Sequence, residues 1–139
     1  MKKKILIIQG SSLKKINIKT DTSFFLGLEA QRRSYQIYYY EPKDLSFING
    51  KVTALCSKVK FLDNPKQPIK IISKSVLNLL QAKLILIRSE PPFNQQYINT
   101  TFILEHISKK VRIINHPKAL REVPEKLFSL RLTKFMPQT

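Results

Sequence analysis

The hydrophobic pattern of this chain alternates between short apolar runs and stretches of helical periodicity. Residues 5–8 and 84–87 are unbroken apolar runs, residues 111–114 are nearly so, and residues 36–40 are aromatic and β-branched. Short runs of this kind are typical of strands that are buried on both faces of a parallel sheet. We therefore expect four strands in these places.

Two helices are predicted between these strands. The first follows a loop, with Asp21 placed as its N-cap and with Phe24, Leu28 and Tyr35 at helical spacing. The second begins after Asn94, which is placed to cap it. Its buried stripe consists of Tyr97, Thr100, Ile103, Leu104 and Ile107. Strands that alternate with helices of this length predict right-handed β-α-β units and an α/β fold.

A β-hairpin interrupts the α/β pattern. Asn49-Gly50 favours a two-residue hairpin turn, and strand-forming residues flank it at 46–48 and 52–55. We expect this antiparallel insertion to end near the proline breaks at 64–68. Further along, Pro117 and Pro124 open one or two short helices that run to about residue 132, followed by a loop-like tail.

Composition limits the classes of function. The chain has 139 residues, 42% of them hydrophobic, which is enough for the core of one domain and excludes a disordered polycation. Its formal net charge of +16 raises nucleic acid or an anionic membrane as a partner. However, 19 lysines stand against six arginines, and nucleic-acid readers rely more on arginine. We therefore disfavour a nucleic-acid partner.

Several kinds of site are excluded by what the sequence lacks. Cys56 is the single cysteine, which leaves no intramolecular disulfide and no cysteine-based zinc site, and His106 and His116 lack the spacing of a metal site. Three glycines are too few for a phosphate-binding loop. No apolar run approaches the roughly 20 residues of a membrane span, and the basic N-terminus leads into too short a run for a signal peptide. We expect a cytoplasmic protein with no membrane association and no metal site.

Ligands collect beyond the carboxyl ends of the strands in an open α/β sheet, and a first candidate segment follows the first strand. Asn17, Lys19, Asp21 and Ser23 lie near the N-terminus of a predicted helix, where backbone N–H groups favour an anion. The alternative is an ordinary N-cap on a solvated loop.

Two further segments follow later strands. Arg88 leaves a buried strand just before a Pro-Pro pair and is placed to bind a substrate carboxylate, unless it pairs with Glu90 or Asp21. Lys126 is placed to meet a phosphate, unless it is only solvated. The run at 38–40 offers either a stacking platform for bases or a strand in which Tyr39 faces away from its neighbours. No nucleophile–base pair or carboxylate cluster is present, so the residues indicate a binding domain without a visible catalyst.

These segments resemble the N-terminal domain of prokaryotic glutathione synthetase. The similar stretches, in chain order, are 16–24 (I-N-x-x-K-D-[ST]-[ST]-F in the family), 28–33 (L-E-A-Q-R-R), 44–50, 88–94 (R-K-D-P-P-F-D), 97–105 and 115–128 (N-x-P-x-x-L-R-D-x-N-E-K-L-F). Their order and spacing run nearly end to end along the chain, which makes the resemblance specific.

The resemblance implies a Rossmann-like pre-ATP-grasp domain over residues 1–123, with a mainly parallel sheet flanked by helices, and a junction to an ATP-grasp domain at 124–139. It implies that the complete enzyme joins γ-glutamylcysteine to glycine with ATP and Mg²⁺. The first candidate segment and Arg88 would then bind γ-glutamylcysteine, with Arg88 on one of its carboxylates. Lys126 would lie near the nucleotide.

The chain also departs from the family pattern. It stops where the family enters its ATP-grasp domain, so we expect no ligase activity from the chain alone. A separate ATP-grasp chain would then be its partner, and an exposed apolar docking patch would favour self-association or a homo-oligomer. Glu90 and Glu122 stand in place of aspartates, Asn94 in place of another, and Gln9-Gly10-Ser11 in place of an M-D-P-like turn. The alternatives are an inactive truncated remnant and a basic protein that binds nucleic acid or another polyanion.

Overall fold

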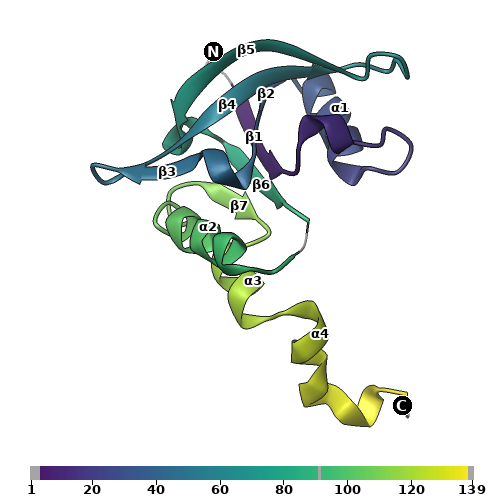
Figure 1. Ribbon diagram of the computed structural model, residues 1–139, viewed down its shortest axis with the longest axis vertical. Helices are drawn as coiled ribbons and strands as arrows, with labels where there is room; N and C mark the ends of the chain where they lie inside the picture. The colour runs from purple at the N-terminus through teal and green to yellow at the C-terminus, as the bar shows by residue number, and fades with distance from the viewer. Residues whose placement is uncertain (1–3, 91, 138–139) are drawn as a thin grey trace.

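Parallel strands form the centre of the sheet in the computed structural model, which describes residues 4–90 and 92–137. β1 (Lys4–Gly10) pairs in parallel with β2 (Tyr35–Tyr40) on one side and with β6 (Leu84–Arg88) on the other. β7 (Arg112–Ile114) extends the sheet beyond β6, again in parallel. All four strands predicted from apolar runs are therefore present, side by side (Figure 1).

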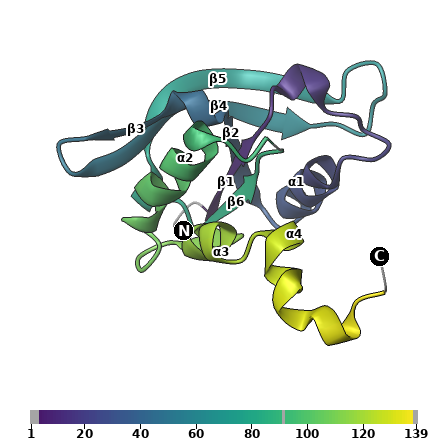
Figure 2. The same ribbon diagram turned by 60° about the horizontal axis from the view of Figure 1, so that its bottom comes forward.

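One long helix packs on each face of this parallel centre, as Figures 1 and 2 show. α1 (Thr22–Arg32) brings Phe24 against Leu6 and Ile8 of β1. α2 (Gln95–Glu105) brings Leu104 to the opposite face, into the core that contains Ile7. Neighbouring residues of β1 thus serve two separate cores, which explains why its sequence is apolar without alternation.

Both predicted helix caps are confirmed. Asp21 accepts hydrogen bonds from two backbone N–H groups of the first turn of α1, and the side chain of Asn94 accepts one from the N–H of Tyr97. One detail of the prediction was wrong, because Tyr35 lies in β2 rather than in the helix. α1 ends at Arg32, and two residues later Ser34 adopts a left-handed conformation (φ 64°) that stops the helical path.

The predicted hairpin joins β3 (Leu45–Ile48) to β4 (Lys51–Phe61). Asn49 (φ 51°) and Gly50 (φ 71°) are both left-handed, as a type I′ turn requires. β4 also pairs antiparallel with β2, and in this way it joins the hairpin to the parallel centre. The fold class is therefore confirmed as α/β with a β-hairpin insertion.

The insertion continues further than the sequence predicted. The prolines at 65 and 68 lie in a connection, after which β5 (Ile69–Asn78) returns along β4 and pairs with it antiparallel. Within the described residues, β5 pairs with no other strand. The strand escaped prediction because it has neither a continuous apolar run nor a clean alternation, and its register shifts opposite Lys58 and Val59.

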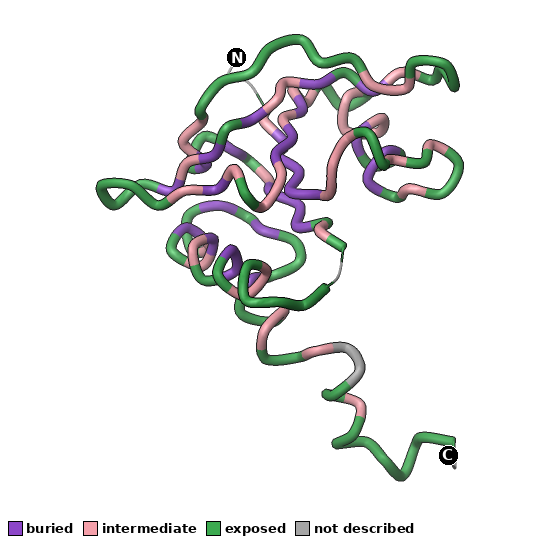
Figure 3. Tube along the Cα trace, viewed as in Figure 1, coloured by how far each residue is buried: buried purple, intermediate pink, exposed green. Residues whose placement is uncertain are grey.

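The buried residues are concentrated on the central strands and on the helix faces that cover them (Figure 3). Cys56 of β4 is fully buried in the core on the α2 face and forms no disulfide. Burial raises the pKa of its thiol to about 12, and the nearby carboxylate of Asp44 adds to the rise. Short 3₁₀ helices complete the connections: η1 (Leu13–Lys15), η2 (Pro42–Asp44) and η3 (Leu79–Gln81).

The C-terminal segment of the chain leaves the sheet through α3 (Pro117–Glu122) and then α4 (Glu125–Phe128) and η4 (Ser129–Phe135). Arg121 fastens α3 to α2, since its guanidinium donates to Thr101 Oγ1 and to the Glu105 carboxylate and lies 3.9 Å from the Phe102 ring centroid. α4 and η4 then extend away from the sheet (Figure 1). Their exposed apolar side chains are Leu127, Phe128, Leu130, Leu132 and Phe135. No helix of the described residues has the length and apolar character needed to cross a membrane.

Candidate functional site

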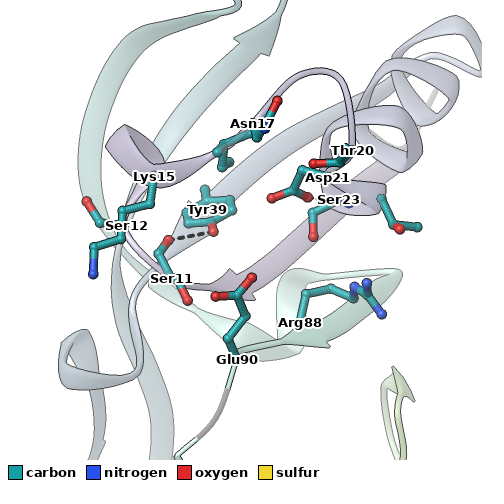
Figure 4. Close-up of a pocket in the computed structure, with 12 residues that line it drawn as sticks. Ser11, Ser12, Lys15, Asn17, Thr20, Asp21, Ser23, Tyr39, Arg88 and Glu90 are labelled. Atoms are coloured by element: carbon teal, nitrogen blue, oxygen red, sulfur yellow. Dashed lines mark hydrogen bonds between the residues drawn. The ribbon is translucent and has the colours of Figure 1, made fainter.

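A hollow of about 230 Å³ lies at the carboxyl end of the parallel strands (Figure 4). One wall is the loop after β1 together with the first turn of α1, and the other is the segment that leaves β6. Tyr39 of β2 also lines the hollow. The strand order accounts for the position, because β1 lies between β2 and β6 and all three end at this edge.

The structure brings four of the six predicted site residues to this hollow. Asn17, Asp21 and Ser23 lie on the helix wall, and Arg88 lies on the opposite wall. Lys19 is exposed and does not line the hollow. Lys126 belongs to α4, and its side chain lies outside the described residues.

The helix wall is held by its own polar side chains. Asp21 Oδ1 accepts from the N–H of Ser23 at 2.7 Å and from that of Phe24 at 3.4 Å. Asn17 Oδ1 accepts from the N–H of Lys19 at 3.0 Å, and the carbonyl of Asn17 accepts from the N–H of Asp21 at 2.8 Å. Asn17 and Asp21 therefore shape the loop as well as lining the hollow, so the prediction of an ordinary N-cap describes part of their role.

Charges of both signs face the hollow. Lys15 and Arg88 are the cations, and Asp21 and Glu90 are the anions. Among the described residues, none of these four side chains takes part in a salt bridge, so the pairing of Arg88 with Glu90 or Asp21 does not occur there. A ligand that carries both an ammonium group and a carboxylate would find partners on both walls.

Tyr39 is bonded to the loop that forms the helix wall of the hollow. Its hydroxyl donates to the carbonyl of Ser11 at 2.6 Å. Burial raises the pKa of this phenol, and the carboxylates of Asp21, Glu41 and Glu90 raise it further, so the hydroxyl keeps the proton that it donates. A Cβ on Gly10 would lie 2.1 Å from the Tyr39 hydroxyl oxygen, which explains the glycine at this close approach.

Among the lining residues that sequence reasoning did not place in the site are Ser11, Lys15 and Tyr39, and it considered Glu90 only as a partner of Arg88. The prediction that Tyr39 faces away from its neighbours is confirmed, because it packs on the α1 face while Tyr38 and Tyr40 pack on the α2 face. The signal that could have found Tyr39 was its position at the end of a strand next to the first one. The sequence does not reveal strand order directly, so this signal could not be used.

The described residues do not suit a magnesium–nucleotide site. They contain no group of three or more His, Cys, Asp or Glu side chains close enough to hold a metal ion. Gly10, Gly27 and Gly50 lie at a strand end, within a helix and in a hairpin turn, and so form no phosphate-binding loop. A metal and a nucleotide would need ligands from elsewhere.

Comparison with known proteins gives one family. Residues 4–121 match the family model described as "Prokaryotic glutathione synthetase, N-terminal domain". The glutathione synthetase of Mesorhizobium japonicum is 38% identical over 139 residues, which is 100% of this chain and 44% of that protein. Those of Buchnera aphidicola subsp. Schizaphis graminum (40% identical over 129 residues) and Escherichia coli K12 (38% over 125) match 92% and 89% of this chain. In both of these the match spans 40% of the relative's length.

Proposed function

Because this chain belongs to the family of prokaryotic glutathione synthetase N-terminal domains, we propose that it provides the dipeptide-binding side of a glutathione synthetase. The complete activity would be the ATP-dependent ligation of γ-glutamylcysteine to glycine. Residues 1–123 would form the substrate-side domain, and residues 124–139 would form the junction to an ATP-grasp domain.

The observation that carries this proposal is that side chains of both charge signs line the hollow. γ-Glutamylcysteine has one ammonium group and two carboxylates, and the hollow offers the cation Arg88 on one wall and the anions Asp21 and Glu90. Arg88 would bind a carboxylate, since a guanidinium forms two parallel hydrogen bonds with such a group. The hydroxyl of Ser23 points toward the other wall and would donate to the same ligand (Figure 4).

The size of the hollow favours a small ligand over a nucleotide. Pockets for drug-sized molecules start at about 300 Å³, and this one has about 230 Å³. We therefore place ATP and Mg²⁺ on an ATP-grasp domain, supplied by a separate chain or by a continuation of this one. Lys126 would lie close to that nucleotide, and the exposed apolar side chains of α4 and η4 would pack against that domain. A cytoplasmic location follows from this role.

A chimaera tests the proposal. The chain replaces the matched N-terminal part of the Escherichia coli relative, and glutathione formation is assayed with and without Arg88→Ala. We expect the chimaera to make glutathione and Arg88→Ala to raise the KM for γ-glutamylcysteine by about 10-fold or more, as the loss of a charged hydrogen bond predicts. Arg112→Ala is the matched control, since it also removes an exposed arginine from a strand of the parallel centre but does not line the hollow.

Two results would contradict the proposal. A folded chimaera with no activity would favour the inactive remnant. An Arg88→Ala variant with an unchanged KM for the dipeptide would remove Arg88 from the site. The full chain, titrated with γ-glutamylcysteine and followed by backbone amide NMR shifts, gives a second readout that needs no ATP-grasp domain.

A further inference from the structure

Two consecutive tyrosines of β2 each hold a different wall of the hollow. Tyr39 and Tyr40 are neighbours at the carboxyl end of the strand, so their side chains lie on opposite faces of the sheet. Both side chains are buried, and both hydroxyls donate hydrogen bonds across to other segments.

Tyr40 acts on the Arg88 wall through a buried glutamine. Its hydroxyl donates to Gln9 Oε1 at 2.8 Å, and Gln9 Nε2 donates to Ser89 Oγ at 3.0 Å. Gln9 is 1% exposed, and this pair of bonds uses both ends of its amide. Ser89 stands between Arg88 and Glu90, so the chain of bonds ends on the segment that carries both charges of that wall.

Tyr39 acts on the helix wall directly. Its hydroxyl donates to the Ser11 carbonyl, in the loop that leads from β1 towards Asn17 and Asp21. The close contact with Gly10 fixes the ring against the turn at which this loop begins.

The backbone hydrogen bonds between strands end where the two walls of the hollow begin. Pairing of β1 with β2 ends at Gln9 and Tyr40, and pairing of β1 with β6 ends at Gly10 and Arg88. Ser11 and Ser89 are thus the residues just past the last ladder pairs on β1 and β6. Side-chain bonds hold the two segments where backbone pairing stops.

We propose that the hydroxyls of Tyr39 and Tyr40, the latter through Gln9 and Ser89, are positioning groups that set the distance between the two walls of the hollow. Arg88 takes part in no salt bridge within the described residues, so the direction of its side chain depends on the backbone that Ser89 anchors. The identity of the ligand rests on the proposed function, whereas the positioning itself does not.

A double-mutant cycle on the full chain tests this arrangement. Tyr40→Phe and Ser89→Ala break the same line of bonds, so we expect each to weaken γ-glutamylcysteine binding by about three- to tenfold, as the loss of one hydrogen bond predicts. The double variant should be no weaker than the worse single variant. Tyr39→Phe breaks a separate bond, so its effect should multiply with that of Ser89→Ala.

Matched controls separate positioning from general stability. Tyr38→Phe removes a hydroxyl from the same strand that forms no hydrogen bond within the described residues, and it should leave binding unchanged. Ser89→Thr keeps the hydroxyl and should restore binding relative to Ser89→Ala. Amide hydrogen exchange of the unliganded chain should be faster at residues 88–90 in Tyr40→Phe and at 11–12 in Tyr39→Phe, with the exchange of β1 unchanged.

Several outcomes would overturn the proposal. One is unchanged exchange at both segments; another is a multiplicative effect of Tyr40→Phe with Ser89→Ala. A third is a loss of binding that follows the global stability of each variant in urea. If the wild-type chain binds no dipeptide but the Tyr39→Phe and Tyr40→Phe variants show these local exchange changes, the proposed ligand is refuted and the positioning role is supported.

Discussion

β1 and β5 contain the same number of isoleucines, but β1 is largely buried and β5 is not. β1 has Ile5, Ile7 and Ile8, and five of its seven residues are buried. β5 has Ile69, Ile71 and Ile72, and none of its ten residues is buried. The number of isoleucines therefore does not decide whether a strand is buried. What differs is the number of neighbours each has.

β1 is paired on both edges and covered on both faces, by α1 and by α2. Within the described residues β5 is paired along one edge only, and of its side chains only Ile69 and Leu77 pack, partly buried, against a core. Since hydrophobic stabilisation scales with the apolar area removed from water, an isoleucine in β1 contributes far more than one in β5. Stability should therefore be concentrated in the parallel centre and should decline towards β5 and the C-terminal arm, which consists of α4 and η4.

The sharpest test of this comparison pairs one isoleucine from each strand. Ile7→Ala should lower the free energy of unfolding by about 2–5 kcal/mol, because it opens a cavity in the buried core on the α2 face. Ile72→Ala, at a side chain that is 54% exposed, should lower it by less than about 0.5 kcal/mol. Urea denaturation followed by circular dichroism measures both, and equal losses would refute the comparison.

A second test uses the tight packing between α1 and β4. A Cβ on Gly27 would lie 2.3 Å from the ring of Phe61, which is itself buried and packed edge-on against Phe24. Gly27→Ala should therefore destabilise the fold by about 1–3 kcal/mol, although alanine favours helices. In a Phe61→Leu background the added methyl group should cost less. A stabilising Gly27→Ala would show that this helix is loosely packed.

The helix caps should matter less than the core. Asp21→Ala removes the acceptor for two N–H groups of α1 and should cost about 1 kcal/mol. Asp21→Asn keeps an acceptor and should cost less, yet it removes a charge from the hollow. If Asp21 binds the ammonium group of the ligand, Asp21→Asn will weaken dipeptide binding while leaving the urea midpoint nearly unchanged.

The smallest effect concerns the contact at which the arm leaves the packed region. Hydrogen bonding from Arg121 lowers the pKa of Glu105 below its ordinary value. Because the carboxyl pKa is lower in the folded chain, this stabilisation is complete above the pKa of an unfolded glutamate, about 4.3. It is lost as the pH falls through the pKa that Glu105 has in the folded chain. The difference in urea midpoint between wild type and Glu105→Gln should therefore shrink in acid. Glu122→Gln, in an exposed pair with Lys118, is the control.

The sequence predicted those parts of the fold that local chemistry determines. Apolar runs, the caps at Asp21 and Asn94, and the left-handed Asn49-Gly50 turn each have a local physical cause, and all are present. β5 could not be predicted in the same way, because it exists by pairing with β4 and buries too little to leave a pattern. Tyr35 was placed in a helix because its spacing from Phe24 and Leu28 is helical. Its position in β2 follows from the left-handed Ser34, which ends the helix, and from pairing with β1.

The sequence likewise predicted only part of the candidate site. Asn17, Asp21, Ser23 and Arg88 follow from helix starts and strand ends, and they line one hollow. Tyr39 joins them through strand order, which no single segment of sequence encodes, whereas Glu90 lies in the same segment as Arg88 and was considered only as its partner. The bonds from Tyr40 through Gln9 to Ser89 connect three strand ends and could be found only once those ends were side by side.

Cys56 has a practical consequence for a protein that we propose handles a thiol. Its sulfur is inaccessible in the folded chain, and its raised pKa leaves almost no thiolate at neutral pH. Mixed disulfides with a cysteine-containing ligand should therefore not form. Thiol-reactive dyes would then report only on cysteines introduced by design, so a single cysteine placed on the arm or on β5 could be labelled selectively without first removing the native one.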